Sequence, residues 1–221
     1  MSDNSANQNG SQQSNPDYVR AAQVGDCAKI AAIQVPNMVG SLRQGTDLEI
    51  TAETLAPLTP VAVQAQWEAT VSQPPAAGQR VLVAVGEGEV VGFAAMHLTD
   101  QPQAAGAKAA QADGSDAAQQ AATAPVEAAA PASWPTPAVE ITALEVADRY
   151  TQRGHGSRLL AAATDLAGKA GAKRVQVWIV AGDQARIGFY QGAGLAPAGV
   201  RRQLQVGSLP IFEHLWWARL D

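Results

Sequence analysis

The most constraining feature of this sequence is a stretch that predicts a strand, a tight glycine turn and a helix in direct succession. Residues 139–146 read as a strand, Gly154 and Gly156 follow, and Leu159 and Leu160 begin a helical pattern. Such a turn directs several backbone N–H groups and the positive end of the helix dipole at one point. Glycine also lets a ligand approach the backbone closely, because it has no Cβ. The stretch predicts an anion site, most often one for phosphate, although an ordinary strand-to-helix turn has the same pattern.

Two common phosphate motifs do not fit this turn. No Gly-Lys-Ser/Thr follows the glycines, and Leu159 stands where a dinucleotide fingerprint has its third glycine. The spacing resembles the acyl-coenzyme A signature of the Gcn5-related N-acetyltransferases, Arg/Gln-x-x-Gly-x-Gly/Ala. Here it reads Thr151-x-x-Gly154-x-Gly156, with Thr151 in place of the family's Arg or Gln. On this resemblance, backbone N–H groups of the turn would bind the pyrophosphate of coenzyme A, and the residues concerned are Gln152, Arg153, Gly154, His155, Gly156 and Ser157.

A second group of residues further along the chain carries the same resemblance. Many Gcn5-related acetyltransferases have Asn-x-x-Ala-x-x-Phe-Tyr-x-x-x-Gly-Phe after the fifth strand. The spacing of that frame is kept here by Asp183, Arg186, Phe189, Tyr190, Gly194 and Leu195. Asp183, Arg186 and Leu195 replace the family's Asn, Ala and Phe. Two independent matches in the right order make the chain similar to this family over residues 17–221, apart from one insertion.

The resemblance implies an α/β fold with a central mixed, mostly antiparallel sheet flanked by helices. The sheet would be splayed between its fourth and fifth strands, which admits the pantetheine arm of the coenzyme. Residues 37–57 have no clear pattern. Elsewhere the sequence predicts a strand at 17–22, a helix from Asp26 ended by Pro36, a helix at 59–71, a hairpin at 80–85 and 89–98, a strand at 139–146, a helix at 154–170, a strand at 174–180, a short helix at 183–191 and final strands at 201–206 and 211–220.

Two segments have compositions that do not favour a packed core. Residues 1–16 are mainly Ser, Asn, Gln and Gly, which predicts a disordered tail. Residues 99–137 are rich in Ala, Gln, Pro and Gly, with scarcely a large apolar side chain before Trp134. We interpret them as a disordered insertion in a single domain that spans residues 17–221. A linker between two domains is the rival interpretation.

Charge and composition exclude several classes of protein. The formal net charge of the 221 residues is −5, which does not favour a general nucleic-acid surface. Apolar runs are shorter than the ~20 residues of a membrane span, and the N-terminus lacks the features of a signal peptide. We therefore expect a cytoplasmic protein that binds neither nucleic acid nor membrane. Cys27 belongs to an apolar helical face, and it forms no metal-ligand spacing with His97, His155 or His214, so no metal is expected.

The resemblance implies that a neutral amine attacks the thioester of acetyl-CoA directly. An amine with a pKa near about 10 is mostly protonated at neutral pH, so a base or a water chain must take its proton. Glu140 begins the fourth strand, where some family members carry a glutamate base; the alternative is a strand-end carboxylate on the solvent face. Glu145 is a second candidate. Tyr190 matches the family tyrosine that protonates the departing thiolate, and its alternative role is that of a packed aromatic residue.

Other residues are expected to contact the coenzyme. The tetrahedral intermediate needs a hydrogen-bond donor, which the family takes from the backbone of the fourth strand, here near Val146. Asp183 is expected to lie at the coenzyme as well. Arg153 and Arg158 could assist the phosphates, although a solvated helix end explains them equally well. We expect the His155 side chain to face solvent while its N–H contributes to the turn.

Together these features predict an acetyl-CoA-dependent N-acetyltransferase. Its acceptor stays open between a small-molecule amine, an antibiotic, a protein N-terminus and a lysine. Specificity for the acceptor would lie in residues 37–57 and in the loop before Ile211, and both segments are weakly patterned. The last strand, with Trp216 and Trp217, could pair with a second copy and form a homodimer. The alternative is a coenzyme A-binding sensor or interaction module of the same fold without transfer activity, which Thr151 and Asp183 leave open.

Overall fold

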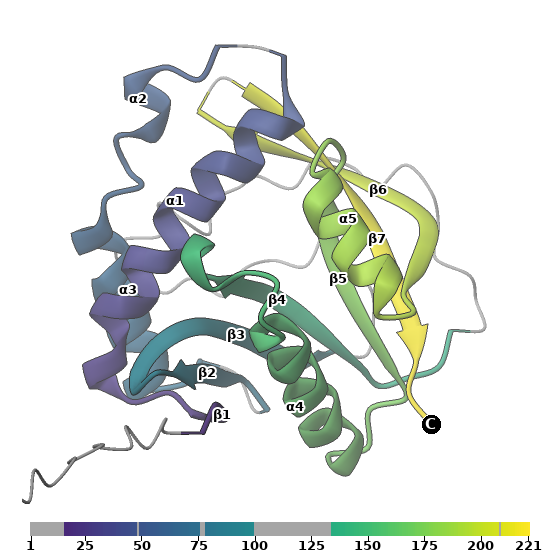
Figure 1. Cartoon of the computed structure of the whole chain (residues 1–221). Coiled ribbons are helices and arrows are strands. Elements are labelled where there is room, and N and C mark those ends of the chain that lie inside the picture. Colours follow the sequence, from purple (N-terminus) through teal and green to yellow (C-terminus); the bar gives the residue numbers. More distant parts are fainter. Residues whose placement is uncertain (1–15, 48, 76–77, 100–133, 208) are drawn as a thin grey trace, which may run out of the picture.

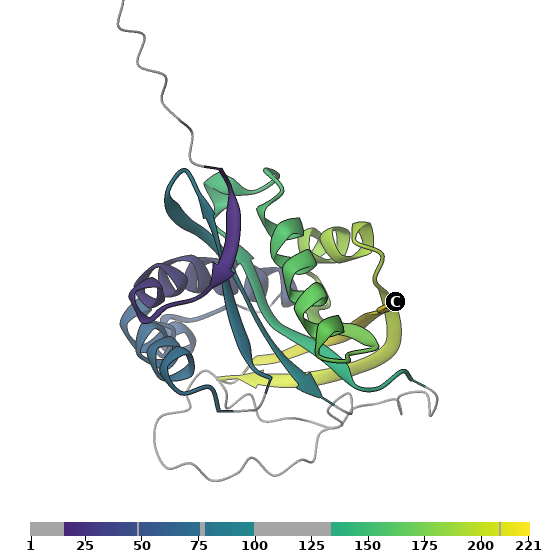
Figure 2. The same cartoon turned by 90° about the horizontal axis from the view of Figure 1, so that it is seen from below.

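The computed structural model describes residues 16–47, 49–75, 78–99, 134–207 and 209–221. The expected N-terminal tail, apart from Pro16, and most of the expected insertion lie outside these residues. Within the described ranges the chain forms a seven-stranded sheet with helices on both faces (Figures 1 and 2). The predicted α/β architecture is confirmed.

The strands follow one another across the sheet in the order β1-β2-β3-β4-β5-β7-β6. β4 and β5 are parallel, and the other neighbouring pairs are antiparallel. Their bounds are Tyr18–Ala21 for β1, Arg80–Gly86 for β2, Glu89–Thr99 for β3, Ala138–Val146 for β4, Arg174–Val180 for β5, Ala196–Val206 for β6 and Leu209–Arg219 for β7. All were predicted, although β6 begins five residues earlier than expected.

Helices cover both faces of the sheet. α1 and α3 lie on one face of the sheet, and α4 and α5 lie on the other (Figure 2). The first residues of two predicted helices are N-caps in the structure, since Thr59 accepts from the N–H of Ala62 at 3.2 Å and Asp183 accepts from that of Arg186 at 3.0 Å. The bounds are Cys27–Gly45 for α1, Ala52–Leu55 for α2, Pro60–Ser72 for α3, His155–Lys169 for α4 and Gln184–Gly192 for α5, with 3₁₀ turns at Val24–Asp26 (η1) and Asp148–Tyr150 (η2).

A β-bulge explains the predicted splay between β4 and β5. The pairing of β3 with β4 passes from Ala95 opposite Ala143 to Met96 opposite Ile141, so Thr142 is an extra residue in β4. Such a bulge bends its strand. β4 pairs with β5 only up to Ile141 opposite Val177, although both strands continue beyond that point. The two strands therefore diverge from Thr142 onward and leave an open wedge.

Apolar side chains bury each helix layer against the sheet. On the α4 face, Leu159, Leu160 and Ala163 pack with strand residues such as Ile141 and Val177. On the α1 face, Ile30 and Ile33 pack with Val83 and Phe93, and Trp67 of α3 meets Phe93 edge-on at 5.3 Å between ring centroids. Cys27 is fully buried, as its apolar helical face predicted.

The prediction that Pro36 ends the first helix is wrong. α1 continues through Pro36 to Gly45, and its second half lies in the segment that had no clear pattern. A proline inside a helix removes one hydrogen bond and costs about 3 kcal/mol. Contacts to the rest of the fold offset this cost: Asn37 and Ser41 bond to β4 and to Asp183, and Leu42 is buried against Ile211. The sequence signal was overridden by tertiary contacts.

The last strand is not the exposed edge that was expected. β7 pairs with β5 on one side and with β6 on the other, so its backbone is not available to a second copy. Trp216 packs against the core of the α4 face, and Trp217 stacks on Trp134 with ring centroids 5.5 Å apart.

The two ends of the expected insertion lie next to each other. Thr99, the last residue of β3, pairs with Ala138, the first residue of β4. The chain thus returns to the point in the sheet that it left, which is the arrangement an insertion within one domain requires. The interpretation as a single interrupted domain remains a prediction.

None of the helices in the described ranges is long and apolar enough to cross a lipid bilayer. The cytoplasmic location expected from the sequence also remains a prediction.

The end of α1 packs tightly on the turn between β5 and α5, and this contact generates a prediction. A Cβ added to Gly182 would lie 1.8 Å from the carbonyl oxygen of Gln44, which is backbone and cannot rotate away. We expect Gly182→Ala to lower the free energy of unfolding by about 3 kcal/mol, the upper end of the usual cost of overpacking, because the contact is to backbone. Gly168→Ala is the control, because an added Cβ there meets nothing within 4 Å in α4. Urea unfolding should show that Gly168→Ala is as stable as the wild type or up to about 1 kcal/mol more stable. Equal effects of the two substitutions on the free energy of unfolding would contradict this packing.

Candidate active site

A cavity of about 880 Å³ lies at the open wedge between β4 and β5. Its walls come from four separate parts of the chain, namely α1, the end of β4, the turn before α4 and the first turns of α5. A cavity of this size is in the range of small-molecule and cofactor sites. The two groups of residues that stood out in the sequence meet at this one cavity.

The predicted phosphate turn forms one part of the wall. The lining residues of this turn are Thr151, Gln152, Gly154, Gly156 and Ser157. Gln152 and Gly154 have positive φ angles of 60° and 82°, and such an alternation brings successive N–H groups to one side. The N–H of Arg158 donates to the carbonyl of Gly154 at 3.0 Å, so the N–H groups ahead of Arg158 have no partner within α4. The turn has the donors and the helix dipole that an anion site needs.

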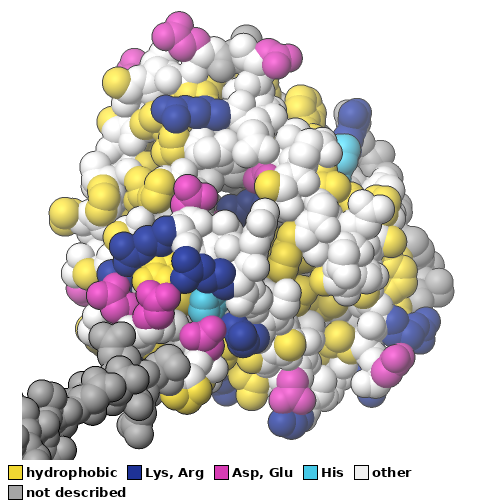
Figure 3. Space-filling model, in the orientation of Figure 1, with side chains coloured by type: hydrophobic (Ala, Val, Ile, Leu, Met, Phe, Trp, Pro, Cys, Tyr) yellow, Lys and Arg dark blue, Asp and Glu magenta, His cyan; other side chains and the backbone are white. Residues whose placement is uncertain are grey.

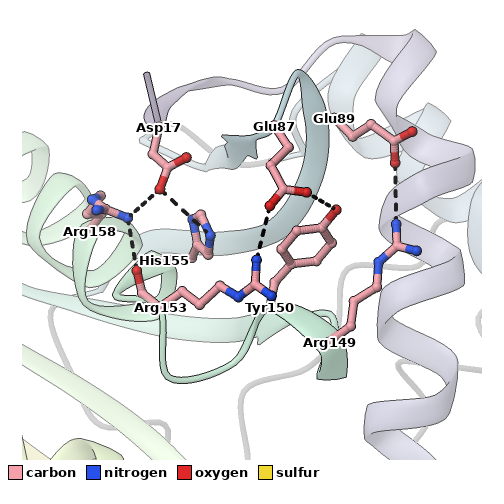
Figure 4. Close-up of polar contacts among 8 residues, drawn as sticks. All are labelled: Asp17, Glu87, Glu89, Arg149, Tyr150, Arg153, His155 and Arg158. Atoms are coloured by element: carbon pink, nitrogen blue, oxygen red, sulfur yellow. Dashed lines mark hydrogen bonds and ion pairs between the residues drawn. The ribbon is translucent and has the colours of Figure 1, made fainter. Parts of the chain in front are cut away.

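An ion-pair network on the outer side of this turn holds it to the β2–β3 hairpin (Figure 4). Arg153 Nη1 lies 3.1 Å from one carboxylate oxygen of Glu87, and Tyr150 donates its hydroxyl to the other at 3.2 Å. The guanidinium carbons of Arg149 and Arg153 lie 4.9 and 5.2 Å from the centroid of the Tyr150 ring. Charged side chains of both signs gather on this face (Figure 3). The Arg153 side chain is thus held outside the cavity.

The expectation that His155 faces solvent is wrong. Its side chain is 3% exposed, and its ring meets that of Tyr150 edge-on at 6.0 Å between centroids. The ring fills the space beside Gly86 of β2, where an added Cβ would meet it at 2.8 Å. Its Nε2 lies 3.9 Å from a carboxylate oxygen of Asp17 (Figure 4). His155, like Arg153, does not line the cavity, so its backbone N–H is the only part left for the predicted role.

Another part of the wall is built around the guanidinium of Arg186, which joins two carboxylates. Its Nη2 lies 2.5 Å from Oε1 of Glu145, at the end of β4, and its Nε lies 3.0 Å from Oδ2 of Asp183. Both carboxylate side chains are almost fully buried, whereas the Arg186 side chain is 26% exposed. All three residues line the cavity. The ion pairs therefore bridge the wedge from β4 to α5.

α1 adds neutral hydrogen-bond donors to the same group. The side-chain amide nitrogen of Asn37 donates to Oε2 of Glu145 at 2.9 Å and to the carbonyl of Val146 at 3.0 Å. Ser41 donates its hydroxyl to Oδ2 of Asp183 at 2.7 Å. Glu145 thus has a charged donor from α5 and a neutral one from α1, which fix the position of its carboxylate.

Burial raises the pKa of Glu145 above the usual range of a glutamate, and the nearby Arg186 and Asn37 oppose that rise. A carboxylate with a raised pKa is a stronger base than a solvent-exposed one, provided it remains ionised at the working pH. Glu145 combines this environment with a place in the cavity wall.

Tyr190 also lines the cavity, beside Phe189, whose ring lies 5.0 Å away between centroids. Only 2% of the Tyr190 residue is exposed, and burial raises the pKa of its hydroxyl. The phenol therefore keeps its proton at neutral pH, which is the form that a proton donor needs.

The structure does not bring Glu140 to the cavity. Glu140 lies five residues before Glu145, roughly 16 Å away along an extended strand. It is 7% exposed, so it is not on the solvent face either, and Gln176 donates to it at 2.7 Å. Gln176 in turn accepts from the buried Arg174. Glu140 belongs to a buried polar chain between β4 and β5, and its position does not support a role as base.

Asn37 and Arg186 are the site residues that the sequence did not reveal. Asn37 follows Pro36, where a helix end was predicted, and it was covered only as part of residues 37–57, the segment without a clear pattern to which acceptor specificity was assigned. Arg186 did carry a signal, because it stands where the resembled family has alanine. A charged residue at a position where a small one is usual indicates a local partner, and here the partners are Glu145 and Asp183.

The double ion pair of Arg186 generates a prediction about stability. Arg186→Leu would leave two buried carboxylates without their cation, which we expect to lower the free energy of unfolding by about 3 kcal/mol. Arg153→Ala is the matched control, because it breaks an ion pair whose side chains are both more than half exposed. Chemical denaturation should show that the free energy of unfolding of Arg153→Ala lies within about 1 kcal/mol of that of the wild type. The account of Arg186 would fail if the two variants were equally stable.

Comparisons with known proteins agree on one family. The model of the acetyltransferase (GNAT) family matches residues 48–195, about two thirds of the chain. A search of curated proteins found none that matches. Similar solved structures include an N-acetyltransferase from Staphylococcus aureus Mu50, with 17% identity, a TM-score of 0.58 and 94% and 100% of the two chains covered. A putative acetyltransferase, yncA, from Salmonella typhimurium was solved with acetyl-CoA (19% identity, TM-score 0.55, 94% and 95% covered).

A third similar structure is the PaiA N-acetyltransferase from Thermoplasma acidophilum in complex with coenzyme A, with 11% identity, a TM-score of 0.57 and 93% and 100% of the chains covered. At such identities the solved structures show a shared fold. The family match adds the activity, because it spans most of the chain and includes both groups of residues that line the cavity. The chain therefore belongs to the acetyltransferase (GNAT) family, whose enzymes move the acetyl group of acetyl-CoA to an amine.

Proposed function

We propose that acetyl-CoA lies in the cavity with its pyrophosphate on the turn of residues 151–157 and its pantetheine arm in the wedge between β4 and β5. One observation carries this proposal: a single cavity is lined both by the anion-binding turn and by Glu145, Arg186 and Tyr190. A thioester reaching from the turn would place its acetyl group near these side chains. Two similar proteins were solved with acetyl-CoA or coenzyme A, which supports this choice of ligand.

Glu145 is the base in the proposed reaction. The acceptor arrives as an ammonium ion and gives one proton to the Glu145 carboxylate. The nitrogen lone pair then attacks the thioester carbonyl carbon, and the carbonyl oxygen takes up negative charge. A backbone N–H near Val146, which lines the cavity, is the proposed donor to that oxygen. Glu145 replaces Glu140 in this role because Glu140 lies outside the cavity.

Tyr190 is the proposed acid. When the tetrahedral intermediate collapses, the carbon–sulfur bond breaks and the sulfur leaves with its electron pair. The buried hydroxyl of Tyr190 donates the proton that turns this thiolate into the free thiol of coenzyme A. The attacking nitrogen loses its second proton as the amide forms, and this proton restores the tyrosine hydroxyl, while Glu145 releases the first one to water. Burial also disfavours the thiolate, so the same environment that raises the pKa of Tyr190 raises the proton affinity of the sulfur.

The acceptor is an amine, either on a small molecule or on a protein. Asp183 has a structural part in this scheme, because it caps α5 and holds Arg186 against Glu145. A binding module without transfer activity remains the rival function, and turnover separates the two.

The role of Glu145 is tested by release of coenzyme A thiol in the presence of an amine acceptor. We expect Glu145→Gln to lower kcat/KM by about 10²–10⁴, the usual contribution of a general base. Because the active form of Glu145 is ionised and burial raises its pKa, the wild-type activity should rise with pH over a range above the ordinary glutamate value of about 4.3. The glutamine variant should lack this rise.

Glu140→Gln is the matched control, since it makes the same chemical change in the same strand outside the cavity. We expect it to keep kcat/KM within about twofold of the wild type. A variant at Glu140 as impaired as the one at Glu145 would contradict the assignment. Absence of thiol release with every amine, from a protein that binds acetyl-CoA, would favour the binding module.

A further inference from the structure

We propose that the acceptor is a cationic amine that carries no carboxylate close to its amino group. This inference rests on the proposed function, since it concerns the acceptor end of the same cavity. We use this name for the part of the wall formed by Asn37, Ser41, Glu145, Asp183 and Arg186. The charge of this end and the way its hydrogen-bond donors are already engaged both point to it.

The acceptor end has a net negative charge. Arg186 contributes one positive charge, and Glu145 and Asp183 contribute two negative charges, so the group sums to −1 when all three are ionised. The other charged side chain in the described wall of the cavity is Asp148, which is also acidic. The wall therefore attracts an ammonium ion and repels a carboxylate.

The donors of Arg186, Asn37 and Ser41 at this end are already engaged with the protein's own oxygens, whereas Gln44 and Tyr190, which also line the cavity, offer only neutral donors. Nη2 and Nε of Arg186 contact Glu145 and Asp183, the Asn37 amide nitrogen donates twice, and the Ser41 hydroxyl donates to Asp183. The other terminal nitrogen of Arg186 is left for a ligand, but it lies beside two carboxylates. A substrate carboxylate that bound here would lose its hydration, find few free hydrogen-bond donors and meet negative charge, which repels it.

An ammonium ion finds the opposite situation. Each oxygen of the Glu145 carboxylate has one protein donor and can accept a further hydrogen bond. The Asn37 amide presents an oxygen as well, because its nitrogen is the engaged atom. These acceptors lie beside the group that takes the proton, so binding of the ammonium ion also brings it to the base.

The basic side chains near the phosphate turn do not change this balance. Arg153 is paired with Glu87 and Arg158 with Asp17, and neither lines the cavity within the described residues (Figure 4). Arg149 is directed at Glu89 on the same outer network. A carboxylate on the acceptor would have no basic partner other than Arg186 in this part of the wall.

Two matched pairs of ligands test the inference: ethylamine against alanine, and 2-phenylethylamine against phenylalanine. The members of each pair differ only by the carboxylate next to the amine. Each would be titrated by calorimetry into the full-length protein saturated with coenzyme A, at neutral pH. We expect the amine to bind at least about tenfold more tightly than its amino acid in at least one pair.

Glu145→Gln removes one negative charge from the acceptor end and should reduce this preference. The matched control is Glu87→Gln, which removes a charge from the outer network and should leave the preference unchanged. Equal or tighter binding of the amino acids, absence of amine binding at millimolar concentration in both pairs, or an unchanged preference in Glu145→Gln would each overturn the inference.

Release of coenzyme A thiol, measured in parallel with acetyl-CoA, separates this inference from the proposed function. Amines that bind preferentially but release no thiol would mean that the proposed function fails while the preference of the cavity for amines without a carboxylate stands. Acetylation of phenylalanine as fast as that of 2-phenylethylamine would mean that the proposed function stands while the inference fails.

Discussion

The rest of the site depends on the ion pairs of Arg186 across the open side of the sheet. β4 and β5 lose their hydrogen bonds beyond Ile141, so the opening of the wedge also removes backbone pairing from the sheet. Arg186 restores a connection there, because it links Glu145 of β4 to Asp183 at the start of α5. Desolvated charges are costly when unpaired. The side chains that hold the wedge together are therefore the same ones that can do chemistry in it.

α1 closes the wedge from the other face of the sheet, which accounts for its continuation through Pro36. Asn37 and Ser41 bond to the two carboxylates that Arg186 joins, and both lie in the second half of the helix. A helix that stopped at Pro36 would leave those carboxylates with one donor group fewer each. The outer network around Tyr150 has the corresponding task at the phosphate turn, where it ties the turn to the β2–β3 hairpin.

The sequence predicted the order of elements and the phosphate turn well, because both depend on local patterns such as strand alternation, helix caps and glycine positions. It did not predict which carboxylate of β4 lies in the cavity wall, for a physical reason that lies in one residue. The extra residue Thr142 shifts the alternation of side chains along β4. Which partners the two glutamates meet then depends on contacts between distant parts of the chain. Glu145 contacts Asn37 and Arg186, whereas Glu140 contacts Gln176. A burial pattern read from one strand carries no information about a bulge or about the partners across it.

Thermal denaturation with and without acetyl-CoA tests the central claim most directly, with the wild type compared with Gly156→Val and Gly168→Val. Gly156 lines the cavity, and even a Cβ there would lie 3.3 Å from the Phe189 ring, whereas Gly168 faces open space in α4. At ~100 times its dissociation constant the ligand should add about 2.7 kcal/mol, or roughly 5–11 °C in Tm, to the wild type and to Gly168→Val. A folded Gly156→Val protein should lose this shift. An equal shift in all three proteins, or none in the wild type, would contradict the placement of the coenzyme on this turn.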